Sequence, residues 1–319
     1  MTHTADSTSI PVGTTLSVKV PATTANLGPG FDTLGLALSL YDELEVEVRE
    51  EPGIHVNVLG VGEGVVPTDE TNLVARALAH VFERFGQPVP GLEIVAHNAI
   101  PHSRGLGSSG AAIVAGIMAA KGLLEGIVDI GSIELLELAT ELEGHPDNVA
   151  PALFGGLTIA WVGEDGPKHK KLIAHRGVSA VVFVPEAAMS TALARSLQPA
   201  SVPHEDAIFN VSRSALLVAA LIQSPELLLA ATEDRLHQSY RASAMLETDE
   251  LIRMLREHGL AAVVSGAGPS VLVLGNDPSQ RLLAADLVAA NSVSTWQPLM
   301  LAVDFKGATV MVHPVEGSA

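Results

Sequence analysis

The sequence has no cysteine and very few aromatic residues. Among its 319 residues, phenylalanine, tryptophan and tyrosine together make up 3%. The lack of thiols excludes disulfide bonds, thiolate zinc sites, iron–sulfur clusters and a thiol nucleophile. This composition suits a reducing compartment, and we expect a cytoplasmic location. With so few aromatic rings, the core must be built from alanine, valine, leucine and isoleucine.

Basic residues are half as frequent as acidic ones. Lysine and arginine number 18 against 36 aspartates and glutamates, which gives a formal net charge of −18 with histidine neutral. Such a chain repels nucleic-acid phosphates and anionic membrane surfaces, and no run of basic residues reverses the average. We therefore expect neither nucleic acid nor a membrane as a partner.

Long hydrophobic runs are also missing. The longest, such as residues 111–120 and 215–222, are shorter than the roughly 18 to 20 apolar residues that a membrane-spanning helix requires. The length of the chain suggests two domains, because a single domain commonly holds about 100 to 200 residues.

Hydrophobic patterning predicts mixed α and β structure in both halves of the chain. In the first half we expect strands at 16–20, 44–49, 54–59, 92–96 and 158–162, and helices at 72–85, 108–124 and 132–144. In the second half we expect strand-like segments at 179–184 and 261–274, and helices at 208–222, 225–231 and 249–257. Residues 163–171 are polar and contain glycine and proline, so the predicted domains are 1–163 and 164–319.

The most informative segment is a glycine- and serine-rich loop between a predicted strand and a predicted buried helix. Gly105, Gly107 and Gly110 let a ligand approach the backbone, and Ser108 and Ser109 add hydroxyl groups. The first N–H groups of the following helix have no partner within the helix and carry its positive dipole end. These features predict a phosphate cradle, although the glycines could instead serve a tight turn alone.

Three known nucleotide-binding loops fit this segment poorly. A Walker A loop ends in Gly-Lys-Ser/Thr, and no lysine is present here. A dinucleotide-binding loop requires an acidic residue about 20 positions further on at the end of a strand, whereas Glu125 and Asp129 lie in or beside helical sequence. A protein-kinase loop has a valine two positions after its last glycine, where this chain has Ala112.

The loop instead resembles the signature of the GHMP kinases, the family of galactokinase, homoserine kinase, mevalonate kinase and phosphomevalonate kinase. Segments 20–32 and 264–270 match the other motifs of the family in the expected order, so the resemblance spans nearly the whole chain. One departure is Gly110, where many relatives carry alanine.

The resemblance implies an ATP-dependent phosphotransferase with two α+β domains. The first domain would resemble domain 2 of ribosomal protein S5, and the second would be ferredoxin-like. The substrate cleft would lie between them, with segment 264–270 in a supporting role. The resemblance also implies that ATP contacts the following residues: Asn72, Pro101, His102, Ser103, Arg104, Gly105, Leu106, Gly107, Ser108, Ser109 and Gly110.

Within the family, residues 25–35, 71–73 and 145–151 are similar to the homoserine kinases. A homoserine substrate needs a carboxylate for its ammonium group, a guanidinium for its carboxylate and a polar group to orient its hydroxyl. The resemblance assigns these roles to the following residues: Asn26 to the hydroxyl, Asp32 and Asp147 to the ammonium with His145 beside them, and Arg195 and Arg241 to the carboxylate, with Thr191 as a further contact.

These residues also have purely structural explanations. Asn26 and Asp32 could close glycine-rich turns, for which both residue types are common. Arg195 and Arg241 could be solvated helix charges. His145 could satisfy the last carbonyl groups of the preceding helix.

The resemblance further implies a magnesium ion beside the loop. The family holds its metal between the second serine of the loop, here Ser109, and a glutamate eight residues before His145, here Glu137. Hydroxyl and carboxylate oxygens suit Mg²⁺. The alternative is an exposed acidic helix face, because residues 134, 141 and 143 are glutamates too. The choice of Glu137 over Glu141 depends on helical register alone.

The resemblance does not supply a catalytic base. Mevalonate kinase has an aspartate as base where the homoserine kinases carry an asparagine, here Asn148, and an amide cannot accept a proton at neutral pH. Catalysis would then come from in-line positioning of the hydroxyl against the γ-phosphate, with Mg²⁺ and loop N–H groups stabilising the charge. The expected catalytic residues are Asn26, Ser109, Glu137 and Asn148.

The activity implied by the resemblance is phosphorylation of L-homoserine to O-phospho-L-homoserine in threonine biosynthesis. The alternatives are another GHMP kinase that acts on mevalonate or a sugar, and a nucleotide-binding regulator without turnover. The sequence leaves open whether the protein forms a homodimer.

Overall fold

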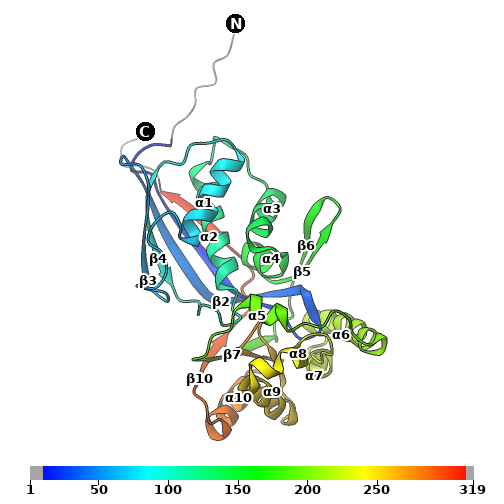
Figure 1. Cartoon of the computed structure of the whole chain (residues 1–319). Helices are drawn as coiled ribbons and strands as arrows, with labels where there is room; N and C mark the ends of the chain where they lie inside the picture. The colour runs from blue at the N-terminus through cyan, green and yellow to red at the C-terminus, as the bar shows by residue number, and fades with distance from the viewer. Residues whose placement is uncertain (1–9, 314–319) are drawn as a thin grey trace.

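Two β-sheets organise the protein, one in each half of the molecule (Figure 1). The computed structural model describes residues 10–313. The first sheet has seven strands in the order β11-β1-β2-β4-β3, with β5 pairing to β2 and β6 to β5. These strands are β1 (Thr15–Asn26), β2 (Gly30–Arg49), β3 (Ile54–Gly60), β4 (Gly91–Asn98), β5 (Leu157–Gly163), β6 (Gly166–Leu172) and β11 (Thr309–His313). Only β3 and β4 run parallel.

Four helices cover one face of the first sheet (Figure 1). They are α1 (Leu73–Arg84), α2 (Ser108–Leu123), α3 (Ser132–Glu143) and α4 (Pro146–Phe154). The predicted helices at 72–85, 108–124 and 132–144 are confirmed. α2 is buried on most sides. Its small side chains let the neighbouring elements pack closely around it. A Cβ atom on Gly116 would lie 2.3 Å from the carbonyl oxygen of Val74, so only glycine lets α1 approach this closely.

The second sheet has the connectivity of a ferredoxin-like domain, as expected. Its order is β10-β7-β9-β8, and all its neighbouring strands are antiparallel. The strands are β7 (Ser179–Pro185), β8 (Ala261–Val264), β9 (Val271–Gly275) and β10 (Trp296–Leu301). The helices of this half are α5 (Thr191–Ser196), α6 (His204–Ile222), α7 (Leu228–Ala231), α8 (Gln238–Arg241), α9 (Leu246–Glu257) and α10 (Pro278–Asn291), with short 3₁₀ turns at Pro225–Leu227 and Ala242–Ala244.

Both faces of the second sheet are buried, because successive side chains of a strand point to opposite faces. On β7, Val181 and Phe183 pack in a cluster with Leu251 and Leu255 of α9. Val182 and Val184 belong instead to the large core that continues into the first half. The two halves therefore share one continuous hydrophobic core.

The first sheet extends past the predicted division after residue 163. Residues 166–172 form β6, which pairs with β5, and β11 near the end of the chain pairs with β1. The first sheet therefore takes residues from both sides of the predicted boundary. β6 is an edge strand in which no residue is fully buried, so it lacks the apolar alternation by which a strand is recognised.

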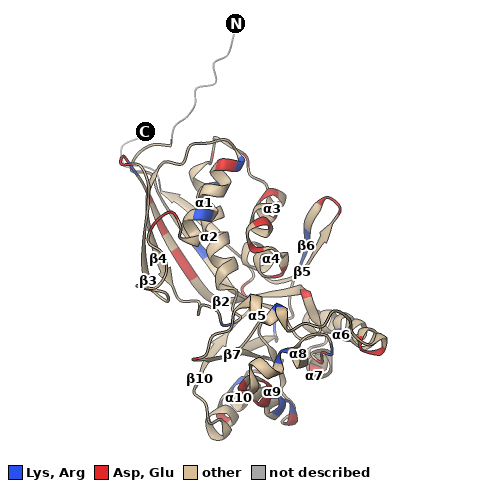
Figure 2. Ribbon diagram, viewed as in Figure 1, with Lys and Arg blue, Asp and Glu red and all other residues tan. Residues whose placement is uncertain are grey.

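Charged groups are spread over both halves (Figure 2). Acidic positions recur along α3, which carries glutamates at 134, 137, 141 and 143. Within residues 10–313, no helix combines the length and the apolar character needed to cross a membrane.

Candidate active site

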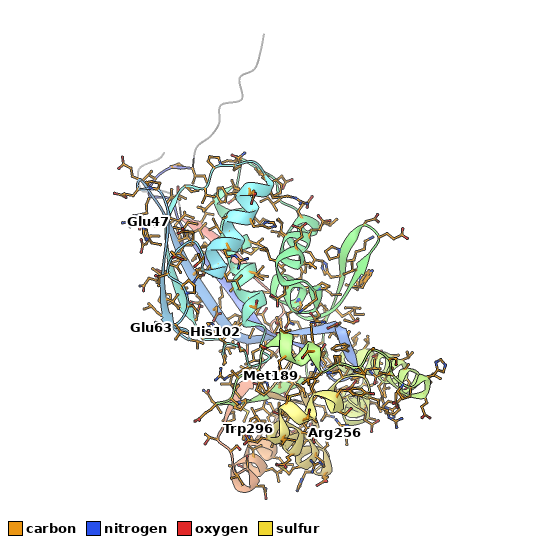
Figure 3. The ribbon with its side chains drawn as sticks, viewed as in Figure 1. Glu47, Glu63, His102, Met189, Arg256 and Trp296 are labelled. Atoms are coloured by element: carbon orange, nitrogen blue, oxygen red, sulfur yellow. The ribbon has the colours of Figure 1, made fainter. Side chains whose placement is uncertain are left out.

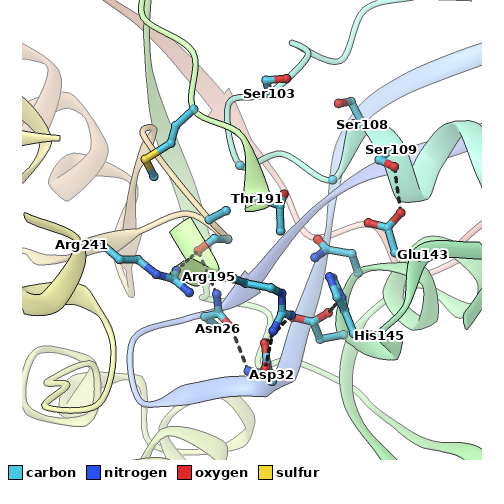
Figure 4. A pocket seen from close by; sticks show the side chains of 17 residues that line it. Asn26, Asp32, Ser103, Ser108, Ser109, Glu143, His145, Thr191, Arg195 and Arg241 are labelled. Carbon is cyan, nitrogen blue, oxygen red and sulfur yellow. Dashed lines mark hydrogen bonds and ion pairs between the residues drawn. The ribbon is translucent and has the colours of Figure 1, made fainter. Parts of the chain in front are cut away.

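A small polar cavity of about 120 Å³ lies where the two halves meet (Figure 4). Its walls come from the loop before α2, the loop before α4, the turn between β1 and β2, and the second half. All seven predicted substrate residues line it: Asn26, Asp32, His145, Asp147, Thr191, Arg195 and Arg241. Asn148 and Ser109 of the expected catalytic set are also present.

The N-terminus of α2 opens onto this cavity without a capping side chain. Its N-cap residue, Gly107, has a left-handed backbone with φ of 69°, and no acidic residue stands in the first turn. Ser108 and Ser109 line the cavity, and the N–H groups of the first turn are unpaired within the helix. Free N–H groups and the positive end of the helix dipole make this an anion-binding position.

The third family motif, residues 264–270, packs against the phosphate loop. A Cβ atom on Gly105 would lie 2.0 Å from the carbonyl oxygen of Ser265, which explains why glycine is needed there. The Ser265 hydroxyl lies 2.6 Å from the carbonyl oxygen of Gly105 and 2.9 Å from the Thr24 hydroxyl. The loop thus rests on the turn between β8 and β9.

Two residues predicted to contact the nucleotide, Arg104 and Leu106, have structural roles in the protein. The Arg104 guanidinium donates hydrogen bonds to the carbonyl oxygens of His102, Pro185 and Glu186. Leu106 is fully buried in the core. These bonds, with a 3.0 Å bond from the Met189 N–H to the Ser103 carbonyl, fasten the phosphate loop to the segment between β7 and α5. His102 and Met189 lie at this junction in Figure 3.

The turn between β1 and β2 is held in an unusual backbone conformation. Asn26, Leu27 and Asp32 have φ values of 71°, 50° and 53°, a region that residues other than glycine enter only when their surroundings stabilise it. The Asn26 carboxamide bonds at both ends, accepting from the Asp32 N–H at 2.9 Å and donating to the Gly266 carbonyl at 2.8 Å. Asn26 thus fixes the turn, and its role toward a substrate hydroxyl stays a prediction.

Side chains of the second half bind the backbone of this turn and pack against it. His237 is fully buried, and its Nε2 hydrogen-bonds the Gly28 carbonyl at 2.7 Å while its ring stacks on Phe31 at 4.8 Å. Burial lowers the pKa of His237, which favours the neutral form of the ring. Asn210 and Ser214 of α6 donate to the Pro29 carbonyl. Asp32 is therefore positioned by both halves of the protein.

The cavity contains charges of both signs. Arg195 of α5 forms a two-pronged ion pair with Asp32, with nitrogen–oxygen distances of 3.0 and 3.1 Å (Figure 4). Arg241 is buried beneath Phe31, and one of its nitrogens lies 3.3 Å from the Gly266 carbonyl. Burial lowers the pKa of Arg241, although nearby Asp32 acts in the opposite direction.

His145 and Asp147 form a second pair of side chains in the cavity wall. Nδ1 of His145 hydrogen-bonds Oδ1 of Asp147, and this bond raises the pKa of His145. Asp147 is buried at the start of α4. The raised pKa favours the protonated imidazole, which would stabilise the buried carboxylate beside the cavity.

The structure does not bring Ser109 and Glu137 together. The Ser109 hydroxyl donates to Glu143 at 2.8 Å, and Glu143 lines the cavity (Figure 4). Glu137 instead faces β6, where its carboxylate would lie 3.5 Å from a Cβ atom on Gly166. Glu143 lies about 9 Å further along the axis of α3 and on another face of the helix. The remaining candidate, Glu141, contacts His80 and Arg84.

Burial raises the pKa of Glu143, while the hydrogen bond from Ser109 opposes this shift. A cation beside this carboxylate would stabilise its charged form. Among the residues that the structure describes, no cluster of three or more histidine, aspartate or glutamate side chains could hold a metal. One serine and one carboxylate fit an ion that takes its other ligands from phosphate and water.

A larger and more apolar cavity of about 320 Å³ shares the lining residues Ser103, Ser108 and Ser109 with the small one. Its walls include Val58, Val66, Pro67, Leu73, Ala96 and Ala112. Asn72 lies at its edge, where its side chain caps α1 and donates to the Pro67 carbonyl. Burial lowers the pKa of His102, which also lines this cavity. Apart from Asn72 and the loop residues, sequence reasoning missed these walls, because they come from separate elements without a shared motif.

Comparison with known proteins places the chain in a family. The family descriptions "GHMP kinases N terminal domain" and "GHMP kinases C terminal" match residues 72–156 and 216–291. A homoserine kinase of Leifsonia xyli subsp. xyli is 75% identical over 298 residues, covering 93% of this chain and 92% of that protein. The protein belongs to the GHMP kinases. It is therefore an ATP-using phosphotransferase that acts on an alcohol group.

Two further comparisons support this membership. A homoserine kinase of Streptomyces avermitilis is 50% identical over 295 residues, covering 92% of this chain and 95% of that protein. The crystal structure of homoserine kinase from Cytophaga hutchinsonii superposes with a TM-score of 0.82 at 26% identity, covering 97% of this chain and all of the other. The kinase thus has the two-domain GHMP fold, as the sequence motifs implied.

Proposed function

We propose that this kinase transfers the γ-phosphoryl group of ATP to the hydroxyl of L-homoserine, forming O-phospho-L-homoserine and ADP in threonine biosynthesis. The observation that carries the proposal is the pairing of opposite charges in the small cavity beside the free N-terminus of α2. The identity with homoserine kinases supports the same substrate.

The charges of the cavity suit an α-amino acid, which carries its ammonium and carboxylate on one carbon. Asp32 and Arg195 lie side by side, so the ammonium can face Asp32 while the carboxylate faces Arg195. Buried Arg241 offers a second guanidinium for the carboxylate, and Asp147 adds negative charge near the ammonium. Thr191, at the start of α5, lines the cavity as a further neutral polar contact for the substrate.

The larger cavity suits the adenine and ribose of ATP. Its apolar walls match the flat face of a base, and it meets the small cavity at Ser108 and Ser109. A nucleotide in this orientation places its phosphates at the N-terminus of α2 and its γ-phosphate toward the substrate.

We propose that Ser109 and Glu143 hold a magnesium ion. The contact between their side chains at the phosphate position supports this assignment. When bound, the ion would supply positive charge to the phosphate oxygens during transfer.

In the proposed reaction, the substrate hydroxyl oxygen bonds to the γ-phosphorus while the bond from that phosphorus to ADP breaks. The hydroxyl proton passes to a phosphoryl oxygen, because Asn148 is an amide and cannot accept it. The chain's own contribution is to orient the hydroxyl through Asn148 and to bind phosphate charge through the N–H groups of α2. Location in the cytoplasm and assembly into a homodimer stay predictions.

The test is ADP production by the purified protein with Mg²⁺ and ATP, comparing L-homoserine with mevalonate, galactose and no acceptor. Turnover with homoserine alone is expected. Turnover with mevalonate or galactose instead would agree with kinase activity but would contradict homoserine as the substrate. The absence of acceptor-dependent ADP would favour a nucleotide-binding regulator.

A further inference from the structure

A buried threonine contacts the asparagine of the active site. Thr23 lies within β1 and is fully buried. Its hydroxyl donates to Oδ1 of Asn148 at 2.9 Å, across 125 positions of sequence. Its N–H donates to the Leu106 carbonyl of the phosphate loop at 3.1 Å. One residue therefore links the sheet, the phosphate loop and the start of α4.

This contact is tightly enclosed. A Cβ atom on Gly107 would lie 2.0 Å from the Thr23 hydroxyl and 3.1 Å from Oδ1 of Asn148. The N-cap residue of α2 therefore packs directly against this hydrogen bond. Thr23 is the protein side chain that bonds the amide oxygen of Asn148.

In the structure, Oδ1 of Asn148 points to the Thr23 hydroxyl, so the amide nitrogen Nδ2 is the end turned away from Thr23. Oδ1 is occupied by Thr23, and within residues 10–313 no acceptor pairs with Nδ2. Asn148 lines the small cavity together with Asp32 and Ser109, whereas Thr23 does not. Nδ2 is thus the end of the amide left for a group inside the cavity.

We propose that Thr23 is a positioning residue for catalysis, an inference that rests on the proposed function. By binding Oδ1, Thr23 presents Nδ2 of Asn148 to the substrate hydroxyl oxygen. That N–H occupies one lone pair of the hydroxyl oxygen, and the other lone pair faces the γ-phosphorus. Thr23 touches neither substrate nor nucleotide and acts only through Asn148.

The hydrogen bond should matter more in the transition state than in substrate binding. Asp32 and the two arginines bind the charged end of the substrate, so loss of the Thr23 hydroxyl should leave KM within about twofold. An amide free to turn over would present oxygen as often as nitrogen, and attack would lose its alignment. We expect Thr23→Val to lower kcat about 10- to 100-fold.

The experiment is a double-mutant cycle between Thr23→Val and Asn148→Ala, measured as kcat and KM for homoserine at saturating Mg²⁺-ATP. In the Asn148→Ala background, Thr23→Val should change kcat less than about twofold, because the residue it positions is gone. Thr23→Ser, which keeps the hydroxyl, should restore most of kcat.

Thr24→Val is the matched control. Thr24 is the next residue, is equally buried, and bonds the Ser265 hydroxyl rather than Asn148. Thr24→Val should change kcat by the same factor in the wild-type and in the Asn148→Ala background. Should Thr23→Val not fold, by circular dichroism and thermal melting, the cycle is run with Thr23→Ala, which also removes the hydroxyl.

Equal kcat losses from Thr23→Val in both backgrounds would overturn the proposal, as would a loss confined to KM or a failure of Thr23→Ser to rescue. A wild-type enzyme that phosphorylates another acceptor would contradict the proposed substrate instead. The cycle is then measured with that acceptor, so the two failures are distinguishable.

Discussion

Replacing Asp42 by asparagine should stabilise the protein, and by an amount that grows with pH. Asp42 of β2 is buried and borders the larger cavity. Its Oδ1 accepts hydrogen bonds from the N–H groups of Ala99 and Ile100 at 2.7 and 2.9 Å. Burial nevertheless raises its pKa from 3.8 to about 6. Asparagine keeps an acceptor for both N–H groups and carries no charge.

The direction in which stability changes with pH follows from proton binding by Asp42. Below pH 3.8 the carboxyl is protonated in both the folded and the unfolded chain. As the pH rises, the unfolded chain releases this proton first, so stability is lost until the pH passes about 6 and stays lost above it. The loss is about 1.5 kcal/mol at pH 5 and about 3 kcal/mol at pH 8.

The assay is urea unfolding of the wild type and Asp42→Asn without nucleotide at pH 5 and pH 8. The variant's gain in unfolding free energy should be about twice as large at pH 8. Asp42→Ala is the control: it leaves both N–H groups without their acceptor and should destabilise the protein at both pH values. A gain that is the same at pH 5 and pH 8 would refute the buried-charge explanation.

Three further variants test the site and its supports. Asp32→Asn should raise KM for homoserine about 10- to 100-fold with a smaller effect on kcat, since it removes the charge that faces the ammonium. Glu143→Gln should lower kcat by about 100-fold or more at ordinary Mg²⁺ concentrations, whereas the matched variant Glu137→Gln, on the face toward Gly166, should remain near wild type. Gly28→Ala should lower the unfolding free energy by about 2 kcal/mol or more, because its φ is +86° and the new Cβ would lie 2.6 Å from the Thr232 carbonyl oxygen.

Steady-state kinetics with varied homoserine and Mg²⁺ checks the first two variants, and urea unfolding checks the third. An unchanged KM in Asp32→Asn would contradict the ammonium assignment. Equal kcat losses in Glu143→Gln and Glu137→Gln would contradict the metal assignment. Wild-type stability of Gly28→Ala would mean that the turn does not hold the two halves together.

The sequence predicted the parts of the fold whose residues repeat regularly. Residues 72–85 and 132–144 carry apolar residues at helical spacing, and both are helices. β6 and β11 were not predicted, because they are edge strands with few buried side chains. Pairing with a neighbour, rather than local pattern, makes them strands.

The site was predicted through motifs, and its geometry was not. Asp32 and Arg195 were named from family resemblance, since nothing in their local sequence indicates that they meet across 163 positions. The contact between Ser109 and Glu143 was not expected, because the sequence alone does not show which of several glutamates on one helix faces the loop when each residue turns about 100° from the last. The sequence signal that favours Glu143 is its place directly before Gly144, where the helix ends and the chain turns toward the cavity.

The position of β11 has a consequence for synthesis of the chain. β1 leaves the ribosome early, but its edge partner β11 is the last strand described and cannot pair until residues 309–313 have emerged. Until then the N–H and C=O groups along that edge of β1 remain open, and such edges readily pair with strands of other chains. Nascent chains that stall before residue 309 should therefore depend on chaperones more than the finished protein does, even though the phosphate loop before α2 has already been synthesised.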